Sequence, residues 1–149
     1  MSAVNHKPKV LFLCTGNSCR SQMAEGWARH LKADRIEAWS AGLVKHGLNP
    51  YAVQVMAEAG VDISGQTSKT IEVLPEVAFD YVITLCDHAQ ESCPYFPGRI
   101  IHHAFPDPPT LAATAGSEEE QLACYRQVRD QIRDFVLTLP KALLTEEQP

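Results

Sequence analysis

A short apolar run that ends at a cysteine constrains the fold of this chain more than any other feature. The residues before Cys14 are typical of a buried strand, and residues 21–32 have the apolar spacing of a helix. The five residues between Cys14 and Arg20 include Gly16 and Asn17, which are residue types that tolerate the positive φ of a tight turn. A loop of this kind beside a helix N-terminus directs successive backbone N–H groups into one concavity. We therefore expect a site for a tetrahedral anion here.

The side chains of this loop indicate nucleophilic chemistry. The peptide dipoles and a nearby guanidinium are expected to lower the pKa of Cys14 and keep it as a thiolate. Arg20 can hold two anion oxygens with its planar fork, and Ser21 can cap the helix or donate its hydroxyl to the sulfur. The alternative is a buried, inert cysteine beside a surface arginine, and the complete Cys-x5-Arg-Ser unit between a strand and a helix argues against it. The candidate anion-binding residues are Thr15, Gly16, Asn17, Ser18, Cys19, Arg20 and Ser21.

Length and composition describe an ordinary globular protein. The chain has 149 residues, with 45% hydrophobic and 21% charged residues, so one domain over residues 1–149 is expected. A net charge of −5 argues against a nucleic-acid binder, and no apolar run is long enough to cross a membrane. Residues 1–8 are interpreted as an untargeted tail and residues 140–149 as a C-terminal extension, which predicts a cytoplasmic protein. Five cysteines, an odd number, favour free or catalytic thiols over structural disulfides.

Strand-like and helix-like segments alternate along the chain, which predicts an α/β fold with a parallel sheet covered on both faces. Pro50 opens one helix and Gly60 ends it, and Ser117-Glu-Glu-Glu120 has the spacing of a capping box. Residues 105–116 contain three prolines and are expected to form a surface loop. The expected strands are residues 9–13, 36–41, 79–85 and 99–104, and the expected helices are residues 21–32, 50–59, 71–78, 87–93 and 117–139.

Three residues with catalytic chemistry follow three of these strands. Cys14 comes after the first strand, Cys86 after the third, and Asp107 lies in the loop after the fourth. Ligands of parallel α/β sheets bind outside the carboxyl ends of the strands. We therefore expect these residues to meet at one edge of the sheet.

The segment Cys14-Thr-Gly-Asn-Ser-Cys-Arg-Ser21 resembles the signature of low-molecular-weight protein tyrosine phosphatases. Further motifs are more similar to their relatives, the thioredoxin-coupled arsenate reductases, and the resemblance covers about residues 9–139. These motifs are Gln22-Met-Ala-Glu-Gly-Trp27, Ser40-Ala-Gly42, His46-Gly47, Asn49-Pro50, Thr84-Leu-Cys86, Cys93-Pro94, Phe105-Pro-Asp107-Pro108 and Arg126-Gln-Val-Arg-Asp130. The resemblance implies a single domain with a four-stranded parallel sheet, in flavodoxin-like order, flanked by helices on both faces.

The same resemblance implies a role for five residues. Cys14 is expected to be the nucleophile, Arg20 the oxyanion clamp and Asp107 the general acid, with Cys86 and Cys93 as relay thiols. The implied reaction is the reduction of arsenate to arsenite, with thioredoxin as the reductant, and phosphate and sulfate are expected to compete for the site. Detoxification of arsenic is the implied purpose, and no cofactor is expected.

The chain departs from the family pattern in two places. Pro106 stands where a second acidic residue often precedes the catalytic Asp. Some members hold a potassium ion beneath the anion loop with an Asn, a Glu, a Thr and an Asp. Asn17, Glu25 and Thr67 match, but Lys69 occupies the Asp position. An ammonium group there argues against a bound cation, so no metal is expected. Glu25 is expected by default on the solvated surface of its helix.

The spacing of the two relay cysteines has a geometric consequence. Cys86 and Cys93 are seven residues apart, which is about 10.5 Å of rise on a continuous helix. A disulfide needs Cα atoms within roughly 7 Å of each other. Residues 87–92 are therefore expected to unwind or loop when the pair is oxidised, and their local stability is expected to be low. Cys19 and Cys124 receive no role in the relay.

Two other functions compete with the reductase. A tyrosine phosphatase would use Cys14, Arg20 and Asp107, but it needs an aromatic-lined entrance where this chain has two prolines, and it has no need of Cys93. A metal-binding module is a second alternative, although a gap of six residues between its cysteines is unusual for zinc and adjacent histidines on a strand point to opposite faces. Its ligands would come from Cys86, His88, Cys93, His102 and His103.

Overall fold

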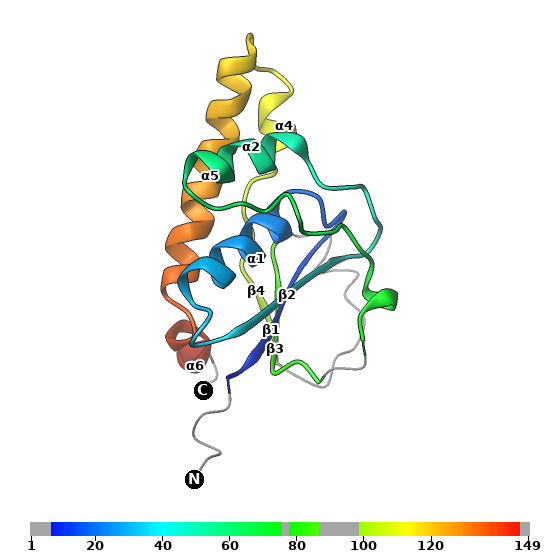
Figure 1. The fold of residues 1–149 in the computed structure, drawn as a ribbon, viewed down its shortest axis with the longest axis vertical. Coiled ribbons are helices and arrows are strands. Elements are labelled where there is room, and N and C mark those ends of the chain that lie inside the picture. Colours follow the sequence, from blue (N-terminus) through cyan, green and yellow to red (C-terminus); the bar gives the residue numbers. More distant parts are fainter. Residues whose placement is uncertain (1–6, 76–77, 87–98, 147–149) are drawn as a thin grey trace.

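Four parallel strands form one sheet in the middle of the molecule (Figure 1). The structure is a computed structural model, and it describes residues 7–75, 78–86 and 99–146. The strands are β1 (Lys9–Cys14), β2 (Glu37–Gly42), β3 (Tyr81–Thr84) and β4 (Arg99–His102), and they lie in the order β2-β1-β3-β4. Every neighbouring pair is parallel, so the predicted sheet and its flavodoxin-like order are confirmed.

Helices pack against this sheet. They are α1 (Arg20–Leu31), α2 (Pro50–Glu58), the 3-10 helix η2 (Ile71–Val73), α4 (Pro108–Ala112), α5 (Glu118–Leu137) and α6 (Lys141–Glu146). None of the described helices is both long and apolar enough to cross a membrane.

β1 is buried on both faces because apolar cores cover both sides of the sheet. Val10 and Phe12 belong to the core that the sheet shares with α1, α2 and α5, whereas Leu11 and Leu13 belong to the core on the opposite face. All four side chains are fully buried, as the unbroken apolar run predicts. The described cover of the second face includes η2, a single helical turn within residues 71–78, where the sequence predicts a short helix.

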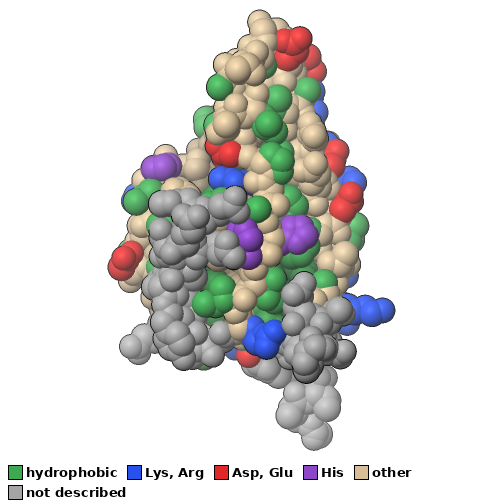
Figure 2. Space-filling view, turned by 180° about the vertical axis from the view of Figure 1, so that it is seen from behind, with side chains coloured by type: hydrophobic (Ala, Val, Ile, Leu, Met, Phe, Trp, Pro, Cys, Tyr) green, Lys and Arg blue, Asp and Glu red, His purple; other side chains and the backbone are tan. Residues whose placement is uncertain are grey.

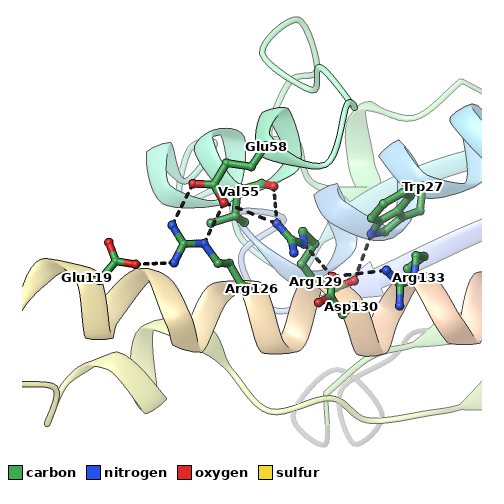
Figure 3. A network of polar contacts seen from close by, with 8 residues as sticks. All are labelled: Trp27, Val55, Glu58, Glu119, Arg126, Arg129, Asp130 and Arg133. Atoms are coloured by element: carbon green, nitrogen blue, oxygen red, sulfur yellow. Dashed lines mark hydrogen bonds and ion pairs between the residues drawn. The ribbon is translucent and has the colours of Figure 1, made fainter.

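Polar contacts add to the apolar packing of α5 against α1 and α2 (Figure 3). Trp27 of α1 donates its indole N–H to the carbonyl oxygen of Arg129 at 3.1 Å, and Arg129 donates to the carbonyl oxygen of Val55 at 2.8 Å. Arg126 forms a two-pronged ion pair with Glu58 at the end of α2. These contacts hold α2 in place, and the N-terminus of α2 adjoins the anion loop.

Side chains and glycine define the helix ends as the sequence predicts. Asn49 caps α2 by accepting two backbone N–H groups, Pro50 occupies its first turn, and Gly60 with φ of 88° follows its end. Ser117 Oγ accepts the N–H of Glu120, while the Glu120 carboxylate accepts the N–H of Gly116. Acidic side chains gather at this end of α5 (Figure 2), where the helix dipole favours negative charge.

Two expectations for the C-terminal third are wrong. Residues 105–116 are not a simple loop, because Pro108 and Pro109 begin α4 at positions where a missing N–H costs nothing. Residues beyond Pro140 are not a plain extension, because they form α6. Its Leu143 is 1% exposed and packs into the main core.

Candidate active site

The loop between β1 and α1 has its carbonyl groups turned away from the pocket. Four of them accept backbone N–H groups from residues 43–49. The pairs are Leu43 N to Cys14 O (3.3 Å), Val44 N to Thr15 O (2.9 Å), His46 N to Gly16 O (3.0 Å) and Asn49 N to Ser18 O (3.0 Å). In a planar trans peptide the C=O and the next N–H point in opposite directions. The N–H group that follows each of these carbonyls therefore points toward the pocket, where it can donate a hydrogen bond to an anion.

Asn17 supports the loop from beneath. Its φ of 48° is the positive value that the sequence predicts for this turn, and its side chain is fully buried. Asn17 Nδ2 donates to Ser21 Oγ at 2.8 Å and to Ser40 Oγ at 3.1 Å. Asn17 Oδ1 accepts from Gln22 Nε2 at 3.0 Å and from the backbone N–H of Lys69 at 2.8 Å. A side chain with both donors and its acceptor engaged holds the loop in one shape.

Two expectations for α1 are wrong. Ser21 does not cap the helix, because α1 already begins at Arg20 and its N-cap residue is Cys19, without a side-chain cap. Glu25 is not on the solvated surface, because it is 4% exposed, accepts the Ser40 hydroxyl at 2.5 Å and pairs with Arg29 at 2.8 Å. Packing of α1 against β2 buries Glu25, and helical periodicity alone does not reveal that neighbour.

Arg20 lines the pocket, and its Nε–H has no partner in the part of the chain that the structure describes. Its NH1 donates to the carbonyl oxygen of Phe105 at 2.9 Å, and its NH2 lies 3.3 Å from Asp107 Oδ1. Its side chain is only 11% exposed, and its Nε is buried without a hydrogen-bond partner among the described residues. An unsatisfied buried N–H costs about 1–3 kcal/mol, and an oxyanion in the pocket would remove that cost.

Asp107, in the segment after β4, lies beside Arg20. It precedes the first residue of α4, and its second carboxylate oxygen accepts the Thr110 hydroxyl at 2.7 Å. Its side chain is 37% exposed, which gives it access to water as well as to the pocket. The predicted meeting of residues from the first and fourth strands is therefore present.

Cys86 reaches the same place from β3. The backbone N–H of Leu85 donates to the carbonyl oxygen of Leu13 at 2.9 Å, which continues the pairing of β3 with β1. Cys86 is thereby set beside Cys14, with its Sγ 3.2 Å from Thr15 Oγ1 in a hydrogen bond. Cys93, the second predicted relay thiol, lies outside the described residues.

The prediction of a lowered pKa for Cys14 is wrong for this state of the protein. A hydrogen bond with Cys86 and burial raise the pKa of Cys14 well above that of an ordinary thiol. Arg20 and the N–H of Thr15 act in the expected direction and lower the pKa, but they do not prevail. The sequence predicts that Cys86 meets Cys14, but only the fold shows that burial and the hydrogen bond between the two sulfurs outweigh Arg20 and the loop.

We expect the change Cys86→Ala to lower the pKa of Cys14, because it removes the largest of the causes that raise this pKa. The rate of Cys14 alkylation by iodoacetamide, followed by peptide mass spectrometry from about pH 6 to pH 10, should reach half its maximum at a lower pH than in the wild type. Cys124→Ala is the matched control, because Cys124 lies on α5 away from the pocket. A rise of the pKa would instead mean that Cys86 donates its proton to a Cys14 thiolate.

The cavity over the loop has a volume of about 370 Å³. Its walls are the anion loop, Arg20, Asp107, Pro109 and His46. Sequence reasoning assigned no role to His46, which entered only as part of a resemblance. The segment between β2 and α2 returns to the anion loop and places His46 over Gly16. Spacing along the sequence does not predict this contact.

Lys69 lies beneath the loop with its charge directed at a carbonyl group. Its Nζ donates to the carbonyl oxygen of Thr67 at 3.0 Å. Burial lowers the pKa of Lys69, and the charge of Glu25 opposes that effect. Within residues 7–75, 78–86 and 99–146, no three His, Cys, Asp or Glu side chains are grouped so as to hold a metal ion.

The two histidines of the alternative metal module have different neighbours. His102 Nδ1 is 2.8 Å from Thr84 Oγ1 in a hydrogen bond, and the ring of His103 stacks on Phe135 with centroids 4.2 Å apart. His88 and Cys93, the other members proposed with Cys86, lie outside the described residues.

Comparison with known proteins places this site in a family. Residues 9–148 match the family described as low molecular weight phosphotyrosine protein phosphatase. The chain belongs to this family. Within it, the chain is 48% identical over 135 residues to an arsenate reductase of Halalkalibacterium halodurans, a match that covers 89% of this chain and 95% of the relative. An arsenate reductase of Bacillus licheniformis is 50% identical over 134 residues, covering 87% of this chain and 93% of that protein.

The structural likeness within the family agrees with the sequence likeness. A solved arsenate reductase "in the phosphate binding state" superposes with a TM-score of 0.70 at 36% identity, over 89% of this chain and 95% of that one. The four-stranded parallel sheet predicted from the sequence is thus the fold of this family.

Proposed function

We propose that this protein reduces arsenate to arsenite, with Cys14 as the nucleophile and Cys86 as the first relay thiol. The observation that carries the proposal is the contact of a second buried thiol, Cys86, with Cys14, which lines a pocket suited to an oxyanion. A phosphatase uses one thiol there, whereas a reductase needs a second sulfur to take up the first. Relatives of nearly half-identical sequence that are named arsenate reductases support the same choice.

The first step is attack on arsenic. Arsenate binds with its oxygens on the amides of residues 15–20 and on the free Nε of Arg20. The Cys14 thiolate forms a bond to arsenic, and one oxygen leaves as water after Asp107 has protonated it. Arg20 and the N–H of Thr15 are the groups that lower the pKa of Cys14, and they favour the thiolate against the opposing effects of Cys86 and burial.

The second step is the reduction itself. The Cys86 thiolate attacks Cys14 Sγ, the sulfur–arsenic bond breaks, and its electron pair stays on arsenic. Arsenic passes from As(V) to As(III) and leaves as arsenite, while two thiols become one Cys14–Cys86 disulfide. The Thr15 hydroxyl, which already lies on Cys86 Sγ, is placed to stabilise that sulfur as a thiolate.

The third step restores Cys14. Cys93 attacks Cys86, which frees Cys14 and leaves a Cys86–Cys93 disulfide for an external dithiol to reduce. We propose thioredoxin as that dithiol and a cytoplasmic location, where the thiols would be kept reduced. Detoxification of arsenic follows as the purpose of the reaction.

The deciding experiment compares two substrates with one enzyme preparation. Arsenate turnover should depend on thioredoxin, thioredoxin reductase and NADPH, and turnover of p-nitrophenyl phosphate should be slow and independent of them. Mass spectrometry of protein quenched after arsenate should find a Cys14–Cys86 or a Cys86–Cys93 disulfide, with Cys124 free in both forms. Fast phosphatase turnover without thioredoxin-dependent arsenate reduction would replace this function with that of a tyrosine phosphatase.

The change Asp107→Asn should lower kcat for arsenate by about 10²–10⁴-fold, the usual contribution of general acid catalysis. The competitive inhibition constant for sulfate should not rise, because sulfate needs no proton from Asp107 and the change removes a negative charge that offsets Arg20. Steady-state kinetics with sulfate as inhibitor measure both quantities. An effect on KM alone would remove the acid role of Asp107.

A further inference from the structure

His46 forms a wall of the oxyanion pocket although it belongs to neither the anion loop nor the relay. Its backbone N–H donates to the carbonyl oxygen of Gly16, which fixes residue 46 beside the loop whatever its side chain. Its ring lies so close over Gly16 that a Cβ on Gly16 would collide with Nδ1 of the imidazole. The ring, although exposed, lies over Gly16 and lines the same cavity as Cys14, Arg20 and Asp107.

The charges of this cavity leave a dianion short of one positive partner. Arg20 contributes one positive charge, and Asp107, 3.3 Å away, offsets it. Cys14 adds negative charge whenever it is a thiolate. Among the side chains that line the pocket, the imidazole of His46 is the second group that can carry positive charge.

We propose that His46 is a substrate-binding residue that donates a hydrogen bond to the outward-facing oxygen of a free tetrahedral dianion, and that its protonated form binds the dianion more tightly. The loop amides and Arg20 bind the inner oxygens of the anion. His46 binds the outer oxygen, which in a phosphate monoester is the oxygen bonded to the organic group. The residue thereby favours an unesterified oxyanion over an ester. This inference rests on the proposed function only in taking a free oxyanion as the ligand.

Other charged groups face His46, and their effects on anion binding must be distinguished from the effect of His46. Across the cavity these are Cys14, Arg20 and Asp107, and on its own segment Lys45 is the exposed neighbour. Lys69, on the segment that bonds to the loop from beneath, directs its Nζ to Thr67 instead. Cys14 and Asp107 are the acidic groups of the cavity whose contribution must be measured separately from that of the imidazole.

Sulfate binding in a Cys14→Ser background tests the proposal. Sulfate stays a dianion from about pH 6 to pH 8, the serine removes the titration of the thiol, and an imidazole ordinarily changes its charge in this range. Calorimetry should find sulfate bound about tenfold more tightly at pH 6 than at pH 8, the gain of a charge-assisted over a neutral hydrogen bond. Adding His46→Gln should abolish the difference, and adding His46→Arg should give the tighter affinity at both pH values.

Two matched variants assign the effect to the imidazole. Lys45→Gln removes a neighbouring charge that does not line the pocket, and Asp107→Asn removes the carboxylate across the cavity. Each change should preserve the dependence of sulfate affinity on pH. Retention of that dependence in the His46→Gln protein, with a melting temperature like that of its parent, would overturn the proposal. Loss of the dependence in the Lys45→Gln protein would overturn it as well. Because sulfate is bound and not reduced, these results stand apart from any failure of arsenate turnover.

Discussion

The change Cys86→Ala is expected to stop arsenate reduction before any arsenite is released. The pocket, Arg20 and Asp107 remain, so arsenate should still bind and esterify Cys14, but no second sulfur is present to displace arsenic from it. Steady-state turnover should fall by at least about 10³-fold, as it does when an obligatory reacting group is removed. The measurement is arsenite released per enzyme after rapid mixing with arsenate in the absence of thioredoxin.

Counting arsenite distinguishes the members of the proposed relay. The Cys86→Ala protein should release none. The Cys93→Ser protein should release about one per enzyme and stop with a Cys14–Cys86 disulfide. Cys124→Ser is the control, and with thioredoxin present it should turn over at the wild-type rate because Cys124 lies on α5 outside the pocket. Sustained, thioredoxin-dependent turnover of the Cys86→Ala or the Cys93→Ser protein would contradict the three-cysteine relay.

The change Arg20→Lys should lower kcat/KM for arsenate by about 10²–10³-fold, the range found when one preorganised oxyanion donor is removed. A lysine ammonium retains the charge but cannot reproduce the planar fork. In the native protein one terminal nitrogen bonds to Phe105, the other lies beside Asp107, and the buried Nε is left for the anion. Lysine has one nitrogen for these three tasks, so Asp107 should also lose its fixed position.

Arg126→Lys is the matched control for the loss of a guanidinium. Arg126 also forms a two-pronged ion pair, but it does so between α5 and α2 at the surface, where such pairs contribute little. Its arsenate kinetics should stay within about twofold of the wild type. Equal losses in the two variants would mean that Arg20 acts through the stability of the fold rather than through the anion.

Local sequence determined the parts of the site that lie within one stretch of chain. The apolar run up to Leu13, the turn at Asn17 and the start of a helix at Arg20 depend on neighbours in sequence, so residue types and spacing predict them. The alternation of strands and helices likewise predicts the parallel sheet, because a parallel pair requires a crossover. The meeting of Cys14, Cys86 and Asp107 follows from that topology, since all three follow strands that end at one edge.

Tertiary structure alone decided what each of these groups experiences. The pKa of Cys14 is raised because β3 brings a second thiol to it, Glu25 is buried because α1 packs on β2, and the residues after β2 return to lay His46 over Gly16. Pro108 is typical of a loop in the sequence and instead opens α4. Burial and long-range charge depend on distances through space, and a pattern along the chain records only distances along the backbone.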